Sequence, residues 1–295
     1  MSKAYEVIAA KITEMLEQGT IPWKKPWRNN SAVLRSYQGR DYRGINLFIL
    51  NAWAQAEGHK GCWLTFNQVQ KLGGKVRKGE KGCPVVFWKF LDELDDEGKA
   101  TGKTIPLCRY YTVFAIDQCE GIDEPSWVAK MKDQAPVDSI ESAEAVWGCY
   151  SGRPELCEGG NQASYSPLMD RIQMPERAFF KDSASYYATL FHEATHSTGH
   201  ESRLSRFKDN RSSSFGTETY SREELVAEMG AAFLCGAAGI EDSRTLENAA
   251  AYIKGWLKAI KDDPRAVVIA AAQAQKAADL ILGKKAEKAT DGSAE

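Results

Sequence analysis

Apolar side chains at helical spacing open the chain. They recur three and four positions apart over residues 4–18, and Gly19 follows where such a helix ends. The next stretch, IPWKKPWRNN, contains two prolines and cannot continue the helix. A second helix is predicted over residues 44–57, and Thr65 followed by Gln68 predicts a capping box that begins a third.

Two segments rich in β-branched and aromatic residues, PVVFWKFL and TIPLCRYYTVFAI, predict a hairpin, and the polar DELDDEGKATGK between them predicts a long solvated loop. The stretch at residues 120–137 is polar and carries two prolines, which is typical of a domain boundary. We therefore predict an α+β protein of two domains, residues 1–125 and 126–282. The remaining residues, 283–295, are poor in apolar side chains and are predicted to be a disordered tail.

Helices dominate the pattern of the second domain. They are predicted over residues 138–150, 183–199 and 221–239, and an alanine-rich helical run covers residues 244–282. A short strand is predicted near residues 171–180. The second domain is thus mostly helical with little sheet.

Charge is divided unevenly along the chain. The net charge is −2, but residues 1–90 hold 15 Lys and Arg against 6 Asp and Glu, which indicates that this half meets a polyanion. Seven scattered cysteines form no C-x-x-C pair, so a disulfide framework is not expected and a reducing cytoplasm is. No apolar run reaches the length of a membrane span, so no membrane partner is expected.

The strongest chemical motif is FHEATHSTGH, which contains His192-Glu193-x-x-His196 at the end of a predicted helix. Two histidines four residues apart share a helix face and can bind one zinc ion, and Glu193 is then placed to act as general base on a metal-bound water. The alternative is a helix with two surface histidines. This spacing favours a metallopeptidase-type site with one Zn²⁺ per chain.

The third protein ligand is expected on the helix SREELVAEMGAAFL, where Glu224 and Glu228 share a face. Ser221-x-x-Glu224 reads as a capping box, which would give Glu224 a structural role, so Glu228 is preferred and Glu224 is the alternative ligand or the partner of a ligand histidine. Against this preference, the Glu-x-x-x-Glu spacing resembles that of glutamate zincins, in which the first acid binds metal. Glu223 is expected to face solvent.

Candidates for stabilising a developing oxyanion are Tyr220 and His200. His200 follows His196 by four residues, but Gly199 is expected to end the helix first and turn His200 away from the metal.

The first domain combines basic and aromatic residues, as expected where phosphates are held and unpaired bases stack. Trp53 and Trp88 are predicted to lie in the core, whereas other aromatic residues stand in loops that contain proline or glycine. The candidate residues for binding single-stranded DNA are Trp23, Lys24, Lys25, Trp27, Arg28, Tyr37, Arg40, Tyr42, Arg43, Lys75, Arg77, Lys78 and Lys81.

The segments IPWKKPW, YQGRDYRGIN and WLTFNQVQKLGGKVRKGEKG resemble the N-terminal domain of the ArdC family of plasmid antirestriction proteins. LFHEATHSTGHESRLSR and YSREELVAEMGAAFL are similar to the zincin-like C-terminal domain of that family. The resemblance implies single-stranded DNA binding and protection of incoming plasmid DNA from host restriction during conjugation, in the cytoplasm. It also implies that His192, Glu193 and His196 are the metal and catalytic positions.

Three functions are compared. The first is an antirestriction factor that binds single-stranded DNA and hydrolyses a peptide, either in a host restriction protein or in another substrate. In this case the strand near residues 171–180 would pair with an extended peptide, as the resemblance to zincins implies. The second is a DNA-binding protein that shields strands by occupancy, with an idle or structural metal site. The third, a metal-dependent nuclease, is disfavoured because nucleases gather carboxylates around hard cations, whereas two histidines suit zinc.

Overall fold

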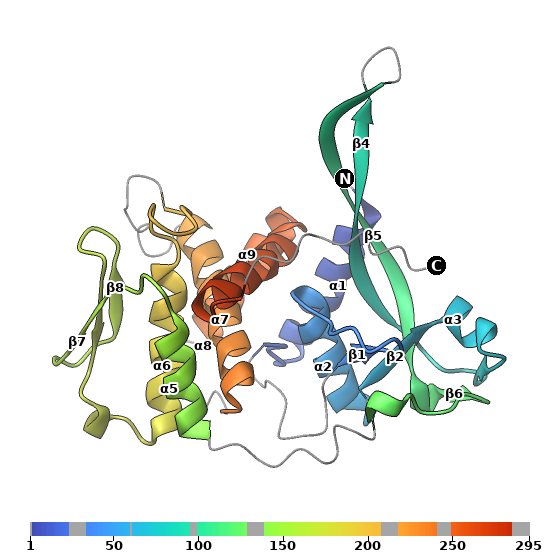
Figure 1. Cartoon of the computed structure of the whole chain (residues 1–295), viewed down its shortest axis with the longest axis horizontal. Coiled ribbons are helices and arrows are strands. Elements are labelled where there is room, and N and C mark those ends of the chain that lie inside the picture. Colours follow the sequence, from blue (N-terminus) through green and yellow to red (C-terminus); the bar gives the residue numbers. More distant parts are fainter. Residues whose placement is uncertain are drawn as a thin grey trace.

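A computed structural model describes residues 2–23, 34–59, 61–94, 99–128, 139–207, 218–240 and 249–284. Within these ranges the protein is α+β, as predicted, and its two domains lie side by side with α7 and α9 between them (Figure 1). The predicted tail, apart from residues 283 and 284, lies outside the described residues. None of the helices in the described ranges is long and apolar enough to span a membrane.

The first domain is built on a four-stranded sheet of order β1-β2-β5-β4, and β3 pairs with β6 beside it. Its elements in chain order are α1 (Lys3–Glu17), β1 (Arg35–Ser36), α2 (Ile45–Glu57), β2 (Cys62–Thr65), α3 (Phe66–Lys71), β3 (Lys75–Val76), β4 (Cys83–Leu94), β5 (Ala100–Ala115), η1 (Ile116–Gln118) and β6 (Cys119–Glu120).

The helices predicted over residues 4–18 and 44–57 are observed as α1 and α2. Thr65 caps α3 through a capping box with Gln68, as the sequence indicated. The predicted long loop between the hairpin strands is wrong, because β4 continues to Leu94 and β5 begins at Ala100. The backbone ladder extends the hairpin through these polar residues, since Asp92 pairs with Thr104, and the hairpin projects from the body as an arm (Figure 1).

The second domain consists of helices with a three-stranded sheet of order β7-β9-β8 at one side. Its elements are α5 (Ser139–Cys149), β7 (Glu155–Glu158), β8 (Ser164–Ser166), β9 (Arg171–Met174), η2 (Arg177–Phe179), α6 (Ser183–Ser197), α7 (Glu218–Ala238), α8 (Ala249–Asp262) and α9 (Ala266–Ile281).

Two expectations about this domain need correction. The alanine-rich run is two helices, because Pro264 separates α8 from α9: proline lacks an N–H and disfavours helical backbone in the residue before it. The strand near residues 171–180 is limited to β9, which lies in the middle of its sheet with β7 parallel on one side and β8 antiparallel on the other. Both hydrogen-bonding edges of β9 are used, so it has none left for an extended substrate.

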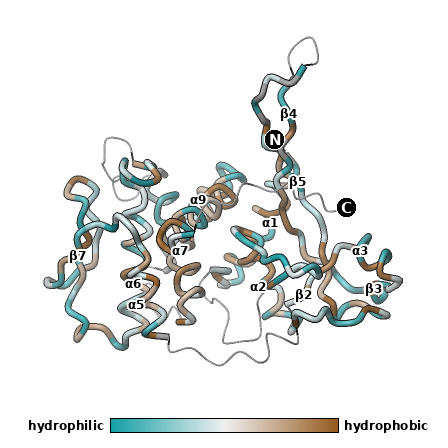
Figure 2. The backbone as a smooth tube through the Cα atoms, viewed as in Figure 1, coloured by the Kyte–Doolittle hydropathy of each residue, from teal (hydrophilic) through white to brown (hydrophobic). Residues whose placement is uncertain are grey.

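One apolar core runs through both domains. Trp23 meets Trp256 of α8 at a centroid distance of 5.3 Å, and Phe48 of α2 stacks on Phe233 of α7 at 4.5 Å. Figure 2 shows apolar stretches of α7 and α9 in this central region. The helices of the second domain therefore complete the core of the first.

Candidate functional site

Helix α6 places the two motif histidines side by side. Asp182 caps the helix by accepting a hydrogen bond from the Ser185 amide at 2.7 Å. His192 and His196 are one turn apart, and their Nε2 atoms lie 3.2 Å from each other. Their side chains are 12% and 14% exposed, so both rings are largely buried.

Helix α7 brings Glu224 to this pair. One carboxylate oxygen of Glu224 lies 3.6 Å from His192 Nε2 and the other lies 3.4 Å from His196 Nε2. One atom from each of the three residues falls within 4.8 Å of the others, and the described ranges contain no further cluster of this kind. These three side chains, which we call the triangle, are placed so that they could hold one metal ion.

Glu228 occupies a different position, 3.2 Å from Nδ1 of His192. It can orient the ring but faces the nitrogen opposite the triangle. The geometry thus favours Glu224 as third ligand and Glu228 as the residue that orients the His192 ring. This is the reverse of the preference drawn from the sequence. That preference rested on Ser221 as a helix cap, and the cap does not exist because α7 begins at Glu218.

Glu223 is not solvated as expected. Its side chain is 17% exposed and one oxygen lies 3.4 Å from His196 Nδ1. The carboxylate accepts two hydrogen bonds from Arg206, at 2.7 and 3.1 Å. Arg206 also donates to Thr198 Oγ1 and to the Thr195 carbonyl. The sequence carried no local signal for this clamp, because Arg206 follows α6 and Glu223 lies on α7.

The helices can approach so closely because Gly230 stands at their crossing. A Cβ on Gly230 would lie 2.4 Å from Thr195 Cγ2 and 2.6 Å from its Oγ1. Both residues are in the part of the structure where α6 and α7 pack. A side chain at position 230 would therefore push Glu224 away from the histidines.

The carboxylates shift the titration of both imidazoles. Burial lowers the pKa of His192, but hydrogen bonds to Glu224 and Glu228 outweigh it and raise the pKa to about 9. For His196, burial acts in the same direction, and Glu223 and Glu224 raise the pKa to about 10. Burial raises the pKa of Glu224, but the two imidazoles hold it well below its usual range. A cation at this site has to displace imidazole protons.

The remaining candidates differ in their access to the triangle. Glu193 is 8% exposed and follows His192 directly on α6. Tyr220 lies four residues before Glu224 on α7 and so shares its face. His200 lies beyond the end of α6, where its Nδ1 is 2.8 Å from Ser202 Oγ. Position therefore favours Tyr220 over His200 as an oxyanion donor.

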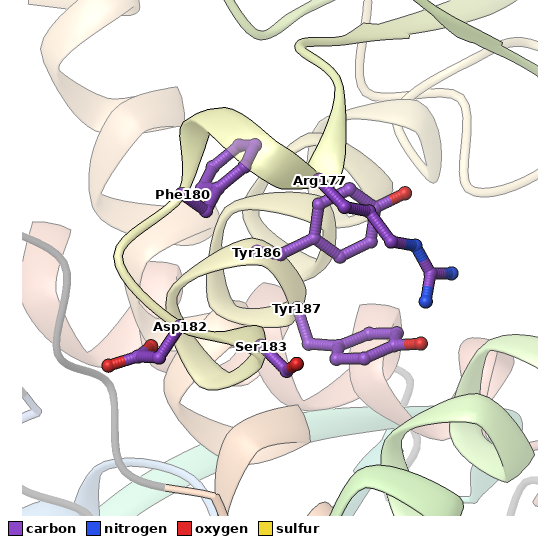
Figure 3. A pocket seen from close by; sticks show the side chains of 6 residues that line it. All are labelled: Arg177, Phe180, Asp182, Ser183, Tyr186 and Tyr187. Carbon is purple, nitrogen blue, oxygen red and sulfur yellow. The ribbon is translucent and has the colours of Figure 1, made fainter.

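A pocket of about 200 Å³ opens at the other end of α6 (Figure 3). It contains Arg177, whose guanidinium lies over the rings of Tyr186 and Tyr187 at 4.7 and 5.4 Å. Glu144 pairs with the same guanidinium at 3.2 Å. Asp182 also lines this pocket, which is separate from the histidine pair.

Some of the predicted DNA-binding residues are buried, some are exposed, and some lie outside the described residues. Trp23 as a stacking residue is wrong: it is 1% exposed and packed against Phe48 and Trp256. Lys24, Lys25, Trp27 and Arg28 lie outside the described residues.

Two loop tyrosines are also poorly placed for stacking. Burial raises the pKa of Tyr42, whose ring packs against the core. Tyr37 is half-buried, and its hydroxyl donates to the Asp123 carbonyl at 3.3 Å. Trp53 and Trp88, predicted as core, are partly buried against it.

The basic candidates within the described ranges are on the surface. These are Arg40, Arg43, Lys75, Arg77, Lys78 and Lys81. Three of them have acidic partners: Arg43 pairs with Asp279 of α9, Lys75 with Glu120, and Arg77 with Glu80.

Family comparisons divide the chain in the same order as the structure. The model for the N-terminal domain of anti-restriction factor ArdC matches residues 2–114. A zincin-like metallopeptidase model matches residues 149–273, which include the histidine pair and Glu224.

Relatives match nearly the full length. Crystal structures of the antirestriction ArdC protein from the R388 plasmid, metal-free and Mn(II)-bound, are 38% identical, with a TM-score of 0.73 and coverage of 94% of this chain and 96% of theirs. The uncharacterized protein y4eC of Sinorhizobium fredii is 34% identical over 96% of this chain and 92% of its own. A DNA primase TraC of Escherichia coli is 36% identical over 94% of this chain, which spans only 20% of the primase.

Proposed function

Because the chain belongs to the ArdC antirestriction family, we propose that it binds single-stranded DNA through its first domain and carries a metallopeptidase-type centre in its second. The observation that carries the proposal is the triangle of His192, His196 and Glu224 beside Glu193. Together the two activities would protect DNA that enters during conjugation from host restriction. The cytoplasm suits this role, and all seven cysteines are free thiols.

The triangle fits one divalent cation. Two imidazole nitrogens and one carboxylate are the protein ligands of many catalytic zinc sites. We propose zinc, because imidazole donors suit transition metals and not the hard cations that prefer oxygen alone. A Mn(II)-bound structure of the R388 relative shows that this relative binds a divalent ion, which supports a divalent cation here.

The bound cation would polarise a peptide carbonyl and lower the pKa of water. Glu193 would take the proton from the attacking water and return it to the leaving amine. Tyr220 would donate a hydrogen bond to the developing oxyanion from the face of α7 that carries Glu224. Glu228 and the Glu223–Arg206 pair would hold the two imidazoles in orientation.

An extended peptide would pair with β8 in place of β9. Within the described sheet β8 is an edge strand, and it packs against α6, which carries the histidines. A host restriction protein is the substrate class that the antirestriction role suggests. Backbone pairing of this kind selects extended segments irrespective of sequence.

A restriction-protection assay tests the proposal by comparing wild type with Glu193→Gln. The variant keeps the three proposed ligands but loses the base, so it should retain metal and single-stranded DNA binding and lose protection. Equal protection by both proteins would contradict the peptidase role and support shielding by occupancy. Failure of the wild type to bind single-stranded DNA would contradict the other half of the proposal.

A further inference from the structure

Among the described residues of the first domain, two aromatic side chains are exposed, whereas the described stacking candidates Trp23, Tyr37 and Tyr42 are not. Among the described residues before position 120, Phe66 is 49% exposed and Tyr110 is 37% exposed. Phe66 is the first residue of α3, and Val69, three residues later in the same helix, is fully buried. The helix is therefore anchored through Val69 while the Phe66 ring stays in solvent.

Strand register places the two rings on one surface. Thr65 of β2 pairs with Val113 of β5, so the chain enters Phe66 beside Thr112. Tyr110 is two residues further along β5 and points to the same side as Thr112, because side chains on a strand alternate. The spacing along the strand between these positions is about 7 Å.

The chain segment that adjoins this surface is basic. A Cβ on Gly82 would lie 2.3 Å from Thr112 Cγ2, so the backbone that follows Lys81 runs directly against Thr112. Lys81, the residue before Gly82, is exposed. Residues 71–89 contain six Lys and Arg and one Glu, so the surroundings are positively charged.

We propose that Phe66 and Tyr110, with the exposed lysines of the adjoining segment 71–89, form the stacking platform for unpaired bases. We call these two aromatic residues the Phe66–Tyr110 patch. The inference rests on the proposed single-stranded DNA binding and assigns its contact residues. Flat rings stack on bases of any sequence, and the lysines of the adjoining segment hold phosphate. A duplex gains less from the patch, since its bases are already stacked on each other.

The test uses the full chain, a fluorescent oligothymidine and a matched duplex, in anisotropy titrations at two salt concentrations. Phe66→Ala and Tyr110→Ala should each weaken single-strand binding by about 5- to 150-fold, the loss of one stacked base. Phe66→Trp and Tyr110→Phe keep a ring and should bind like wild type. Lys81→Ala should weaken binding and reduce the salt slope by about one. Phe179→Ala is the matched control, a 74% exposed ring in the second domain, and should change nothing.

The outcomes separate this inference from the function on which it rests. The Phe66→Leu variant keeps an apolar side chain of similar size, so it should fold, but it has no ring. A loss of single-strand affinity in this variant therefore supports stacking. Wild-type affinity in Phe66→Leu and Tyr110→Ala would overturn the patch while leaving DNA binding by the protein intact. Equal losses for duplex and single strand would also overturn it. No binding by the wild type at any salt would overturn the proposed function and the patch together.

Discussion

At the scale of single residues, each histidine of the centre is paired with a carboxylate of its own. Each imidazole has Nε2 in the triangle with Glu224 and Nδ1 against its own carboxylate, Glu228 for His192 and Glu223 for His196. Such pairing fixes the ring orientation and raises the basicity of the ligand. The roles of the three glutamates can therefore be separated by substitution.

The Glu224→Gln variant should lose most of its zinc affinity, because a neutral amide replaces the anionic carboxylate of the triangle. Glu228→Gln should lose about 10- to 100-fold, the usual cost of disturbing a residue that orients a ligand. A competition titration with a chromophoric chelator measures both, with circular dichroism as the check on folding. The opposite ranking would return the ligand role to Glu228.

Arg206→Lys should weaken zinc binding about 10-fold, since lysine cannot make the forked contact that holds Glu223 against His196. Arg203→Lys is the matched control: Arg203 follows the same helix but pairs with Asp170 and contacts no triangle residue. The same titration measures both variants. Equal losses would mean that Arg206 acts only through general stability.

At the scale of elements, the centre depends on how closely α7 passes α6. Gly230→Ala should lower the free energy of unfolding by about 1–3 kcal/mol through overpacking and should weaken zinc binding, because α7 carries Glu224. Adding Thr195→Ala removes the side-chain atoms in the way and should restore both properties in part. Gly148→Ala on α5, where a Cβ meets nothing within 4 Å, should be neutral or stabilising. Chemical denaturation measures the stabilities, and no coupling between positions 195 and 230 would contradict the crossing argument.

A second inter-element contact gives a pH dependence. Arg203, after α6, pairs with Asp170 before β9; burial raises the pKa of Asp170, but this pairing and Tyr165 hold it below its usual value. A carboxyl with a depressed folded-state pKa stabilises above its unfolded pKa, and this contribution is lost as pH falls through the folded value. As the pH falls from about 5 to about 2, the Tm of the wild type should therefore decrease more than the Tm of Asp170→Asn. Asn also tolerates the positive φ of 45° at this position. Parallel melting curves would contradict the prediction; Asp92→Asn on the arm is the control.

At the scale of the whole molecule, the domains are joined through their cores. Trp23 and Phe48 of the first domain are covered by Trp256 and Phe233 of the second, and Arg43 pairs with Asp279. The start of the segment predicted to hold DNA is thus anchored on a helix of the peptidase-type domain. The proposed DNA-binding site in one domain and the proposed metal centre in the other therefore belong to one folded unit.

Trp256→Ala should destabilise both domains together by about 3–5 kcal/mol, the usual cost of removing a buried tryptophan. Native-state hydrogen exchange measures this at amides of β5 and of α6, whose global opening energies should fall by the same amount. Ile269→Ala, at a 41% exposed position of α9, should stay within about 0.5 kcal/mol of wild type. A loss confined to α6 would show that the first domain is independently stable.

Local spacing along the sequence determined much of this protein. Helix periodicity located α1, α2, α5 and α6, the Thr65–Gln68 pair fixed the start of α3, and the four-residue separation of His192 and His196 placed both rings on one face. These features follow from backbone geometry within a few residues, so no distant contact is needed to establish them.

Only the tertiary structure decided which partners meet. The choice between Glu224 and Glu228, the Arg206–Glu223 clamp and the burial of Trp23 under Trp256 all depend on how α6, α7 and α8 cross. A segment that belongs to the core can have the same composition as an exposed loop, as the buried Trp23 shows. What separates them is packing against residues more than 200 positions away, which no local pattern encodes.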